Sequence, residues 1–412
     1  MSRSLPSAGL VAMVSEHASP LAELGGADAG GQNVYVAQLA AQLTQRGHEV
    51  VVYTRRDGVG LPERVRTSDG VQVVHVPAGP PVPIPKDELL PYMPEFGHWL
   101  AREWAADPPD VVHAHFWMSG MAALAGARAL GAPVVQTYHA LGTVKKRYQG
   151  AADTSPPDRI GIEKAVGREC SAIIATCNDE VAELEAMGLS RRNIFVVPCG
   201  VDPEQFADVS ETRGDGSRTS RLLSVGRLVP RKGIDRAIRA LAAVPGAQLL
   251  IAGGPESTLL ASEPEAERLR TVADECGVSD RVALLGGVSR EQMPWLMSSA
   301  DLVLSLPRYE PFGIVPVEAM ACRTPVVATA VGGQMDTIVD GHTGVLVAPE
   351  TTDHDIGVII RGLLDDRALL AEYGAHGRQR VLGHYTWGHV ADKVARVYSA
   401  VSSAPSLSGV AR

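Results

Sequence analysis

The chain of 412 residues, 45% hydrophobic and 21% charged, is long enough for two globular domains of roughly 200 residues each. Its net charge of −9, with no basic tract to offset it, argues against a general nucleic-acid binder. The five cysteines lie far apart without a CxxC pair, which favours reduced thiols in a cytoplasmic protein. The first apolar stretch, closed by Glu16, predicts a strand rather than a signal peptide, and no run approaches the ~20 residues of a membrane span.

Short apolar runs alternate with helical patterns along the first half of the chain. The runs predict strands at 9–14, 50–54, 73–76, 111–115, 134–137, 173–176 and 194–197. Helical patterns between them include 34–46 and 121–130. Strands this continuously apolar are typical of a parallel sheet covered by helices on both faces.

The alternation stops at 203–220, a polar segment rich in glycine and serine that predicts a linker or loop. It then resumes, with strands expected at 222–225, 248–252, 282–285, 302–304, 326–328 and 345–347, and a last helix at about 387–401. Two runs of βα units predict an α/β protein with two Rossmann-like, doubly wound domains. Because such folds bind ligands beyond the carboxyl ends of their strands, the default site is a cleft between two facing sheets.

The first candidate segment is 25–33, which follows the first strand and contains four glycines. Its glycines and the helix N-terminus behind them suit a phosphate, but a flexible loop capped by Asn33 is an equally good interpretation. The spacing does not match GxGxxG, so a nicotinamide fingerprint is not supported.

The second segment, 226–233, follows the first strand of the second domain and carries Arg227, Arg231 and Lys232. Cations around a turn into a helix can clamp a diphosphate. The alternative is surface charge for solubility; the position at a strand's carboxyl end favours the ligand.

The third segment, 309–318, places Glu310 in a loop and Glu318 in an otherwise apolar helix. A buried carboxylate needs a partner, which ribose hydroxyls or an internal salt bridge could supply. On the residues alone a salt bridge to a helix neighbour is the preferred interpretation.

Histidines gather at His113, His115 and His139, but their strand spacing, without a nearby thiol or carboxylate, is weak evidence for a metal. We expect packing for His113 and a polar contact at the strand end for His139. The single DxD, at 353–355, lies far from the phosphate candidates, so a metal-bridged diphosphate is not expected.

Together these segments resemble the retaining GT-B glycosyltransferases of family 4 over nearly the whole chain. The most specific element is E-x7-E, here Glu310 to Glu318, preceded in the expected order by the glycine-rich loop and by 226–233. Within the family the chain is most similar to the inositol-phosphate N-acetylglucosaminyltransferases of mycothiol synthesis and to sucrose-phosphate synthases. The shared stretches are 30–36, 115–120 and 318–322.

The resemblance implies a donor site and the catalytic residues. Arg227 and Lys232 would neutralise the donor diphosphate, Glu310 would bind sugar hydroxyls, and His139 would touch the transferred sugar. These four are the expected catalytic residues. Donor binding would also involve Glu318 at the ribose, backbone at Gly31, and Phe312 and Gly313. No metal is expected, and the co-substrate would be a nucleotide sugar, with UDP-hexose favoured.

The acceptor site is expected at Asn33, Lys86 and Arg159, the last two matching positions that hold an acceptor phosphate. Phe116 and Ala140 stand where the nearest relatives have tyrosine and threonine, so two hydroxyl donors are missing. A phosphorylated sugar and an unphosphorylated cyclitol both remain open. The implied domains are an acceptor-side domain, 1–203 with 388–412, and a donor domain, 204–387.

The sequence thus predicts hexosyl transfer, with retention, from a nucleotide-diphosphate sugar to a small hydroxylated acceptor such as a sugar, a cyclitol or their phosphate. The alternatives are a GT-B epimerase or phosphorylase, and a silent module that binds nucleotide sugar. The expected partners are small molecules rather than nucleic acid or membrane, and a homo-oligomer is left open.

Overall fold

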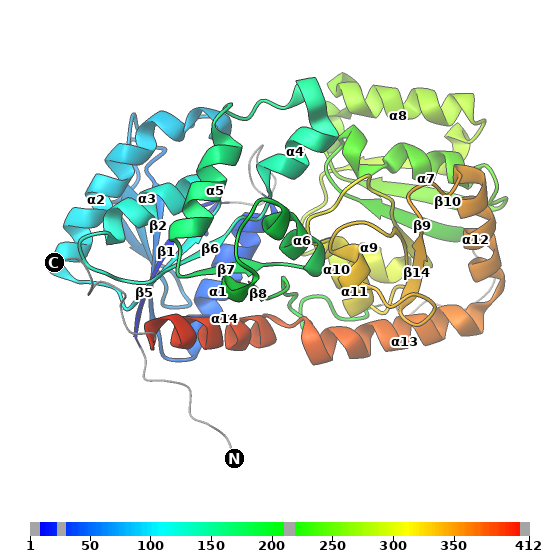
Figure 1. Ribbon diagram of the computed structural model, residues 1–412. Helices are drawn as coiled ribbons and strands as arrows, with labels where there is room; N and C mark the ends of the chain where they lie inside the picture. Colours follow the sequence, from blue (N-terminus) through cyan, green and yellow to red (C-terminus); the bar gives the residue numbers. More distant parts are fainter. Residues whose placement is uncertain (1–8, 23–29, 210–218, 404–412) are drawn as a thin grey trace, which may run out of the picture. The chain divides into compact units, whose positions relative to one another are not determined.

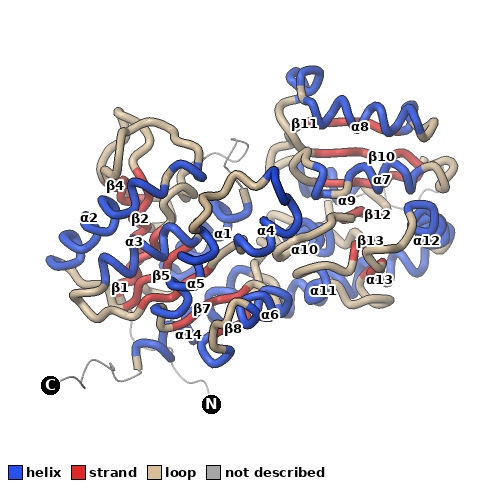
Figure 2. Tube along the Cα trace, turned by 45° about the horizontal axis from the view of Figure 1, so that its top comes forward, coloured by secondary structure: helices blue, strands red, loops and turns tan. Residues whose placement is uncertain are grey.

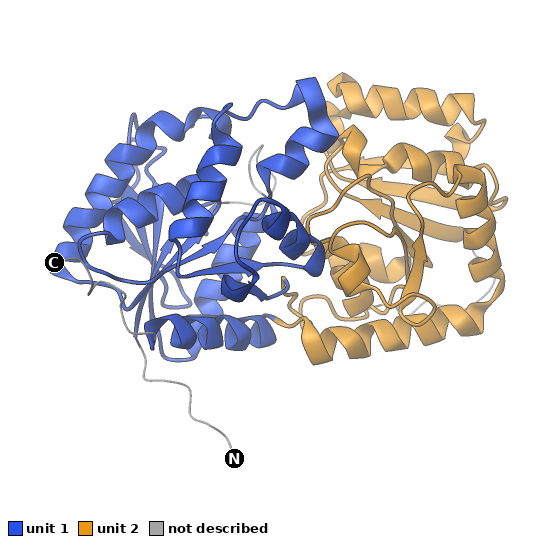
Figure 3. Ribbon diagram, in the orientation of Figure 1, with its two compact units in different colours: residues 1–198, 387–412 blue, residues 199–386 orange. Residues whose placement is uncertain are grey.

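The computed structural model describes residues 9–22, 30–209 and 219–403. The chain forms two compact units: unit 1 comprises Met1–Pro198 with Trp387–Arg412, and unit 2 comprises Cys199–Thr386 (Figure 3). The boundaries expected from sequence differ from these by only a few residues. Most of the glycine-rich loop, 25–29, and the centre of the expected linker, 210–218, lie outside the described residues.

Unit 1 is built on a sheet in the order β3-β4-β2-β1-β5-β6-β7-β8. Its strands are β1 Leu10–Val14, β2 Glu49–Arg55, β3 Arg64–Arg66, β4 Gln72–Val76, β5 Val111–His115, β6 Val134–Thr137, β7 Ala172–Ala175 and β8 Ile194–Val196. All neighbours pair in parallel except β3, which runs antiparallel to β4 at the edge. The predicted strands are confirmed within one or two residues, and β3 is an addition.

Helices cover both faces of this sheet (Figure 2). They are α1 Gly31–Gln45, α2 Met93–Ala106, α3 Trp117–Ala127, α4 Gly142–Gln149, α5 Arg159–Glu169, α6 Asn178–Ala186 and α14 Trp387–Ser402. Short 3-10 helices are η1 Lys86–Glu88, η2 Leu90–Tyr92, η3 Gly150–Ala152 and η4 Arg191–Asn193.

The last helix, α14, belongs to unit 1 although unit 2 precedes it in the chain. It packs against α1, and Figure 1 shows the two side by side, α14 in red and α1 in blue. Val390 and Val394 are fully buried, and Asp392 accepts a hydrogen bond of 2.7 Å from Arg46 at the end of α1. The apolar stripe of α14 is therefore part of the core of unit 1.

Unit 2 has an all-parallel sheet in the order β11-β10-β9-β12-β13-β14. Its strands are β9 Ser220–Val225, β10 Ala247–Ala252, β11 Val282–Gly286, β12 Leu302–Ser305, β13 Val326–Thr329 and β14 Gly344–Val347. Its helices are α7 Ile234–Leu241, α8 Pro264–Glu275, α9 Met293–Ser299, α10 Ile314–Ala321, α11 Gln334–Thr337, α12 Asp353–Asp365 and α13 Arg367–His384, with η5 Pro230–Lys232, η6 Ser257–Ser262 and η7 Ser279–Arg281.

Both sheets contain a switch point, where successive strands depart to opposite sides. In unit 1 the switch lies between β1 and β5, and in unit 2 it lies between β9 and β12. The loops that leave the carboxyl ends of these strands diverge and open a crevice, which is where such sheets bind ligands. The two switch points therefore locate the candidate site within each unit.

All five cysteines are free thiols, as predicted, and Cys170, Cys177 and Cys322 are buried. Within the described ranges, no helix combines the length and the apolar character that crossing a bilayer requires.

Candidate active site

The loop after β9 carries the cationic segment of unit 2. It leads from Gly226 through Arg227 into η5, and Lys232 ends this 3-10 turn. The turn closes at Gly233, whose φ is +64°, and a Cβ at that position would lie 1.8 Å from the carbonyl oxygen of Leu306. Glycine is required here because the loop after β9 passes so close to the loop after β12.

Lys232 and Glu310 form an ion pair across the β9–β12 switch point. Both side chains are partly exposed, at 18% and 14%. The two charges line a small cavity of about 30 Å³ together with Ser305 and Gly313. The sequence motifs at 226–233 and 309–318 are therefore brought together, as the resemblance implied.

The backbone around Glu310 is held by a second tight approach. The N–H of Gly333 donates to the carbonyl of Glu310 at 3.1 Å, and a Cβ on Gly332 would lie 1.9 Å from the same oxygen. Gly313, with φ +84°, then caps the N-terminus of α10, whose first N–H groups face the end of the loop. Phe312 is buried in the core, so it offers this site its backbone rather than its ring.

Glu318 lies in α10 and is buried, as the apolar helix pattern predicted. Its partner is Arg290, in the loop between β11 and α9, with Nη1 3.1 Å from Oε1. Burial raises the pKa of Glu318 to about 7, and the charge of Arg290 opposes the rise. The salt bridge to a helix neighbour that the residues alone favoured is therefore wrong in its partner, which lies in a distant loop. Sequence analysis missed Arg290 because a single arginine in a polar loop carries no pattern.

In unit 1 the three histidines lie along the carboxyl ends of β5 and β6. His113 is fully buried between the Tyr398 hydroxyl at 2.7 Å and the Thr137 hydroxyl at 2.8 Å, which confirms its packing role. Nδ1 of His115 lies 3.1 Å from Nε2 of His139. Burial lowers the pKa values of His113 and His139 to about 3, so both rings are neutral at physiological pH. His139 can therefore form hydrogen bonds but cannot supply a proton.

Gly31 begins α1, and there is open space where its Cβ would be. The side chain of Asn33 is buried and committed to the same turn. Its Oδ1 accepts from the N–H of Gly30 at 3.0 Å, and its Nδ2 donates to the carbonyl of Ser19 at 3.0 Å. This is the capping role that sequence analysis kept as an alternative for Asn33.

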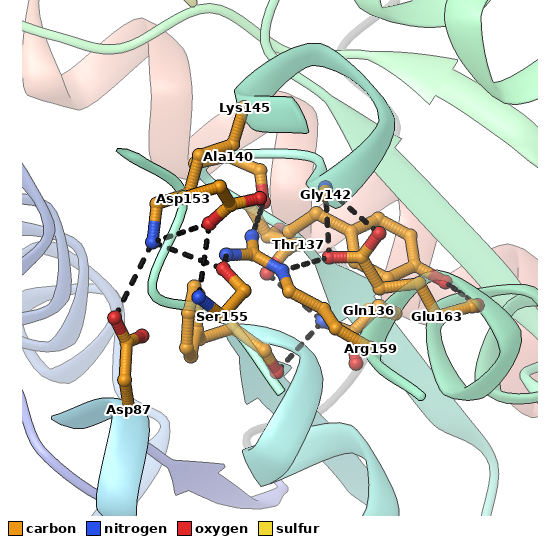
Figure 4. A network of polar contacts seen from close by, with 12 residues as sticks. Asp87, Gln136, Thr137, Ala140, Gly142, Lys145, Asp153, Ser155, Arg159 and Glu163 are labelled. Carbon is orange, nitrogen blue, oxygen red and sulfur yellow. Dashed lines mark hydrogen bonds and ion pairs between the residues drawn. The ribbon is translucent and has the colours of Figure 1, made fainter. Parts of the chain in front are cut away.

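Arg159, at the start of α5, is 3% exposed and bound on several sides (Figure 4). Its guanidinium donates to the Glu163 carboxylate at 2.8 Å, to the Ala140 carbonyl at 2.7 Å and to the Ser155 hydroxyl at 3.1 Å. Its carbon lies 5.2 Å from the centre of the Phe116 ring. Glu163 in turn accepts the N–H of Gly142, so the positive charge of Arg159 is balanced within the fold.

Lys145 in α4 is also balanced by carboxylates. Its Nζ lies 3.3 Å from Asp87 and 3.1 Å from Asp153, and Figure 4 shows it between them. Lys86, the other expected phosphate ligand, begins η1 next to Asp87. The predicted phosphate region thus holds nearly as much negative as positive charge.

Among residues 9–22, 30–209 and 219–403, no group of three or more His, Cys, Asp or Glu side chains is arranged to hold a metal ion. Asp353 of the DxD triplet starts α12 and accepts a 3.0 Å hydrogen bond from Arg236, so its carboxylate supports the packing of α7 and α12.

Comparison with known proteins decides the family. Residues 29–205 match the model for Glycosyltransferase Family 4, and residues 211–380 match that for Glycosyl transferases group 1. Over 409 residues the chain is 39% identical to the D-inositol 3-phosphate glycosyltransferase of Mycolicibacterium smegmatis, covering 95% of this chain and 91% of the relative. The chain belongs to glycosyltransferase family 4.

This family-4 glycosyltransferase is also similar to two further proteins over nearly its whole length. It is 34% identical over 412 residues to the D-inositol 3-phosphate glycosyltransferase of Stackebrandtia nassauensis, covering 94% of this chain and 90% of that one. Among solved structures it resembles the sucrose-phosphate synthase of Thermosynechococcus elongatus, with a TM-score of 0.87 and 30% identity over 96% of this chain and 100% of that one. The fold is therefore GT-B and the protein is a glycosyltransferase, as the sequence predicted.

Proposed function

We propose that this enzyme transfers a hexosyl group, with retention of configuration, from a UDP-hexose to a small hydroxylated acceptor. The observation that carries the proposal is the pairing of Lys232 with Glu310 at the β9–β12 switch point, with Arg227 in the same loop. A cation for a diphosphate and a carboxylate for sugar hydroxyls are the two groups that a nucleotide sugar needs side by side.

In this proposal unit 2 holds the donor. Arg227 and Lys232, with the N-terminus of α10, stabilise the charge that develops on the leaving diphosphate, which is the largest catalytic contribution. Glu310 exchanges its ion pair with Lys232 for hydroxyls of the sugar, and Glu318 accepts hydrogen bonds from the ribose. Two cations near the diphosphate make a metal unnecessary. Backbone near Gly286 and Gly287 would contact the base.

Unit 1 supplies the acceptor side and two contacts to the donor. The backbone of Gly31, at the open N-terminus of α1, would contact the distal phosphate, and neutral His139 would hydrogen-bond the transferred sugar. No side-chain nucleophile is assigned: attack by the acceptor hydroxyl on the face that the diphosphate leaves gives retention directly.

Two acceptors should be assayed first. Inositol 3-phosphate is suggested by the names of the curated relatives, which are 39% and 34% identical. An uncharged polyol is suggested by the charge balance of Arg159 and Lys145, because each cation is already paired with a carboxylate. A phosphate would have to displace one of these partners or share its cation.

A thermal-shift panel with UDP, GDP, ADP and their hexose conjugates tests the donor assignment. A ligand present at ~100 times its Kd should stabilise the fold by roughly 2.7 kcal/mol. We expect UDP-sugars to shift the wild type and to leave Arg227→Ala unshifted. The matched control is Arg361→Ala, an exposed arginine on α12 that should respond like the wild type.

Turnover then separates the remaining alternatives. We expect Lys232→Ala to lower kcat on the order of 100-fold, because the leaving group loses one stabilising charge. A GT-B epimerase would release free sugar or epimer, and a phosphorylase would require inorganic phosphate. Nucleotide-sugar binding without transfer or hydrolysis would instead identify a silent module.

A further inference from the structure

His115 ends β5 and is fully buried, but only one of its two ring nitrogens is used. Nδ1 lies 3.1 Å from Nε2 of His139. Among the residues that the structure describes, Nε2 of His115 has no hydrogen-bond partner. A buried polar atom without a partner lowers stability, and a phenylalanine ring would occupy a similar space without that loss. Packing alone therefore does not explain an imidazole at this position.

The core of unit 1 fixes the orientation of the His115 ring. It packs on the ring of His113, with centroids 4.1 Å apart. His113 is itself held at both nitrogens, by the hydroxyls of Tyr398 and Thr137. Tyr35 also packs against His115, with centroids 5.7 Å apart. Because these neighbours leave the ring little freedom to turn, its Nδ1 is held toward His139.

A single hydrogen lies between the two rings. Burial lowers the pKa values of His115 and His139, so each ring is neutral at physiological pH and carries one hydrogen. If Nδ1 of His115 donates, the hydrogen of His139 is on its Nδ1. If Nε2 of His139 donates, the hydrogen of His115 is on its Nε2. The tautomer of His139 is therefore coupled to that of His115.

The backbone around this histidine pair is strained. Phe116, which follows His115, has φ +83°, and His139 has φ +60°. The N–H of Phe116 donates to the carbonyl of Thr137 at 2.8 Å, which ties the end of β5 to the end of β6. Residues with a side chain rarely adopt such conformations, and this strain concentrates at functional sites. Because His139 is partly exposed and His115 is not, only His139 can reach a ligand.

We propose that His115 is a positioning residue for the sugar contact of His139. It holds Nε2 of His139 and so leaves Nδ1 of that ring as the atom that hydrogen-bonds a hydroxyl of the transferred hexose. This inference rests on the proposed transferase function and makes it more specific. A hydroxyl can donate and accept, so it matches Nδ1 in either of the two coupled tautomers. A ring that is already fixed also loses less conformational entropy when the sugar binds.

The main test is His115→Phe, which keeps an aromatic ring among the same neighbours and removes both nitrogens. We expect little change in melting temperature, because the variant loses one hydrogen bond but also removes the unpartnered Nε2. UDP, which carries no hexose, should shift the melting temperature as it does in the wild type. The kcat for hydrolysis of UDP-glucose and UDP-N-acetylglucosamine should fall about tenfold, as for one hydrogen bond no longer held in place.

A second variant separates positioning from folding. His115→Asn places its side-chain amide near the position of Nδ1 and should recover most of the activity lost in His115→Phe. It also leaves a cavity where the ring was, so it should melt at a lower temperature than His115→Phe does. Activities in the opposite order to the stabilities cannot arise from unfolding. The matched control is His98→Phe, at an exposed histidine on α2 of the same unit, which should behave as the wild type does.

Nitrogen NMR of protein labelled with ¹⁵N-histidine measures the positioning without any substrate. In the wild type the two ring nitrogens of His139 should show the well-separated chemical shifts of a single tautomer. In His115→Phe these shifts should move toward a common average, because the two tautomers then exchange freely. Exposed His98 should give averaged shifts in both proteins.

Failure of this inference can be told from failure of the proposed function. If the wild type neither binds nor hydrolyses UDP-hexose, the proposed function is wrong and the inference falls with it. If the wild type hydrolyses the donor but its His139 already shows averaged shifts, the inference alone is overturned. It is also overturned if His115→Phe releases the tautomer of His139 and its kcat nevertheless equals that of the wild type.

Discussion

Glu318 is a buried carboxylate whose pKa is raised to about 7 by its surroundings, even though Arg290 lies 3.1 Å away. Its neutral form is therefore favoured in the folded protein. Between about pH 4.5 and 7 the folded state binds more protons than the unfolded state, so this residue lowers stability as the pH rises through that window. This loss of stability arises at the position where the proposed donor would supply hydroxyls.

Binding of UDP-hexose should consequently release protons. Ribose hydroxyls that donate to Glu318 favour its ionised form, so near pH 6 binding should release up to one proton, and near pH 8 almost none. Calorimetry in two buffers of different ionisation enthalpy measures this release. Glu318→Gln should abolish it, and a release independent of pH would contradict a ribose contact at Glu318.

Arg159 and Glu163 should contribute to stability through burial. We expect Arg159→Met to lower the free energy of unfolding by about 3–5 kcal/mol, because it leaves the fully buried carboxylate of Glu163 without its cation. Urea denaturation without ligands measures this loss.

The matched control is Arg147→Met, which breaks a pair with Glu183 in which Arg147 is 54% exposed. Its cost should stay under about 1 kcal/mol. Equal losses at the two sites would mean that burial of the Arg159 pair does not determine its contribution.

At the scale of elements, the turn between β9 and α7 depends on Gly233. Gly233→Ala should destabilise the protein more than Gly277→Ala does, although both glycines have φ +64°. At Gly277 a Cβ has open space, so only the backbone strain of roughly 1–2 kcal/mol applies. At Gly233 the clash with Leu306 is added and should move Lys232 away from Glu310.

Denaturation measures the loss of stability, and nucleotide titration measures the effect of moving Lys232 away from Glu310. Gly277→Ala should bind UDP-hexose as the wild type does, whereas Gly233→Ala should bind it more weakly. Equal stability and equal affinity in the two variants would show that the loops can separate without cost.

The elements themselves were largely predictable, for a physical reason. Strands of a parallel sheet are buried on both faces, and a strand such as Leu10–Val14 is therefore apolar throughout. The edge strand β3 was missed because its three residues, Arg64–Arg66, are mostly charged and exposed. The predicted strands, in contrast, needed no knowledge of tertiary contacts.

The residues of the candidate site that belong to sequence motifs could be predicted. Those that are defined only by contacts in the folded chain could not. Arg227, Lys232, Glu310 and Glu318 follow from spacing and from the resemblance. The partner of Glu318 and the commitment of Asn33 to its own turn depend on segments that are distant in sequence or on side-chain direction. Such contacts exist only after folding.

At the scale of the whole molecule, the two units should differ in their dependence on α14. Deletion of 387–412 should loosen unit 1, because Trp387, Val390 and Val394 leave its core and His113 loses the hydroxyl of Tyr398. Unit 2 should keep its fold and still bind UDP-hexose, with an affinity lowered only by the two donor contacts that we propose for unit 1. Hydrogen exchange should then show faster exchange in β1 and β5 and unchanged protection in β9 and β12.

The control is Tyr398→Phe, which removes only the hydroxyl and should cost about 1 kcal/mol. Loss of nucleotide binding in the deletion variant would contradict independence of the two units. Unchanged exchange in β1 and β5 would show that α14 is dispensable.

The return of α14 to unit 1 also sets the order in which the nascent chain can complete its parts. During synthesis, domains usually fold in the order in which they leave the ribosome. Here the later unit, 199–386, is complete before the earlier one, because the first unit still awaits the helix that begins at Trp387. Throughout translation of the second unit, the place of α14 beside α1 therefore stays uncovered, and unit 2 can mature before unit 1.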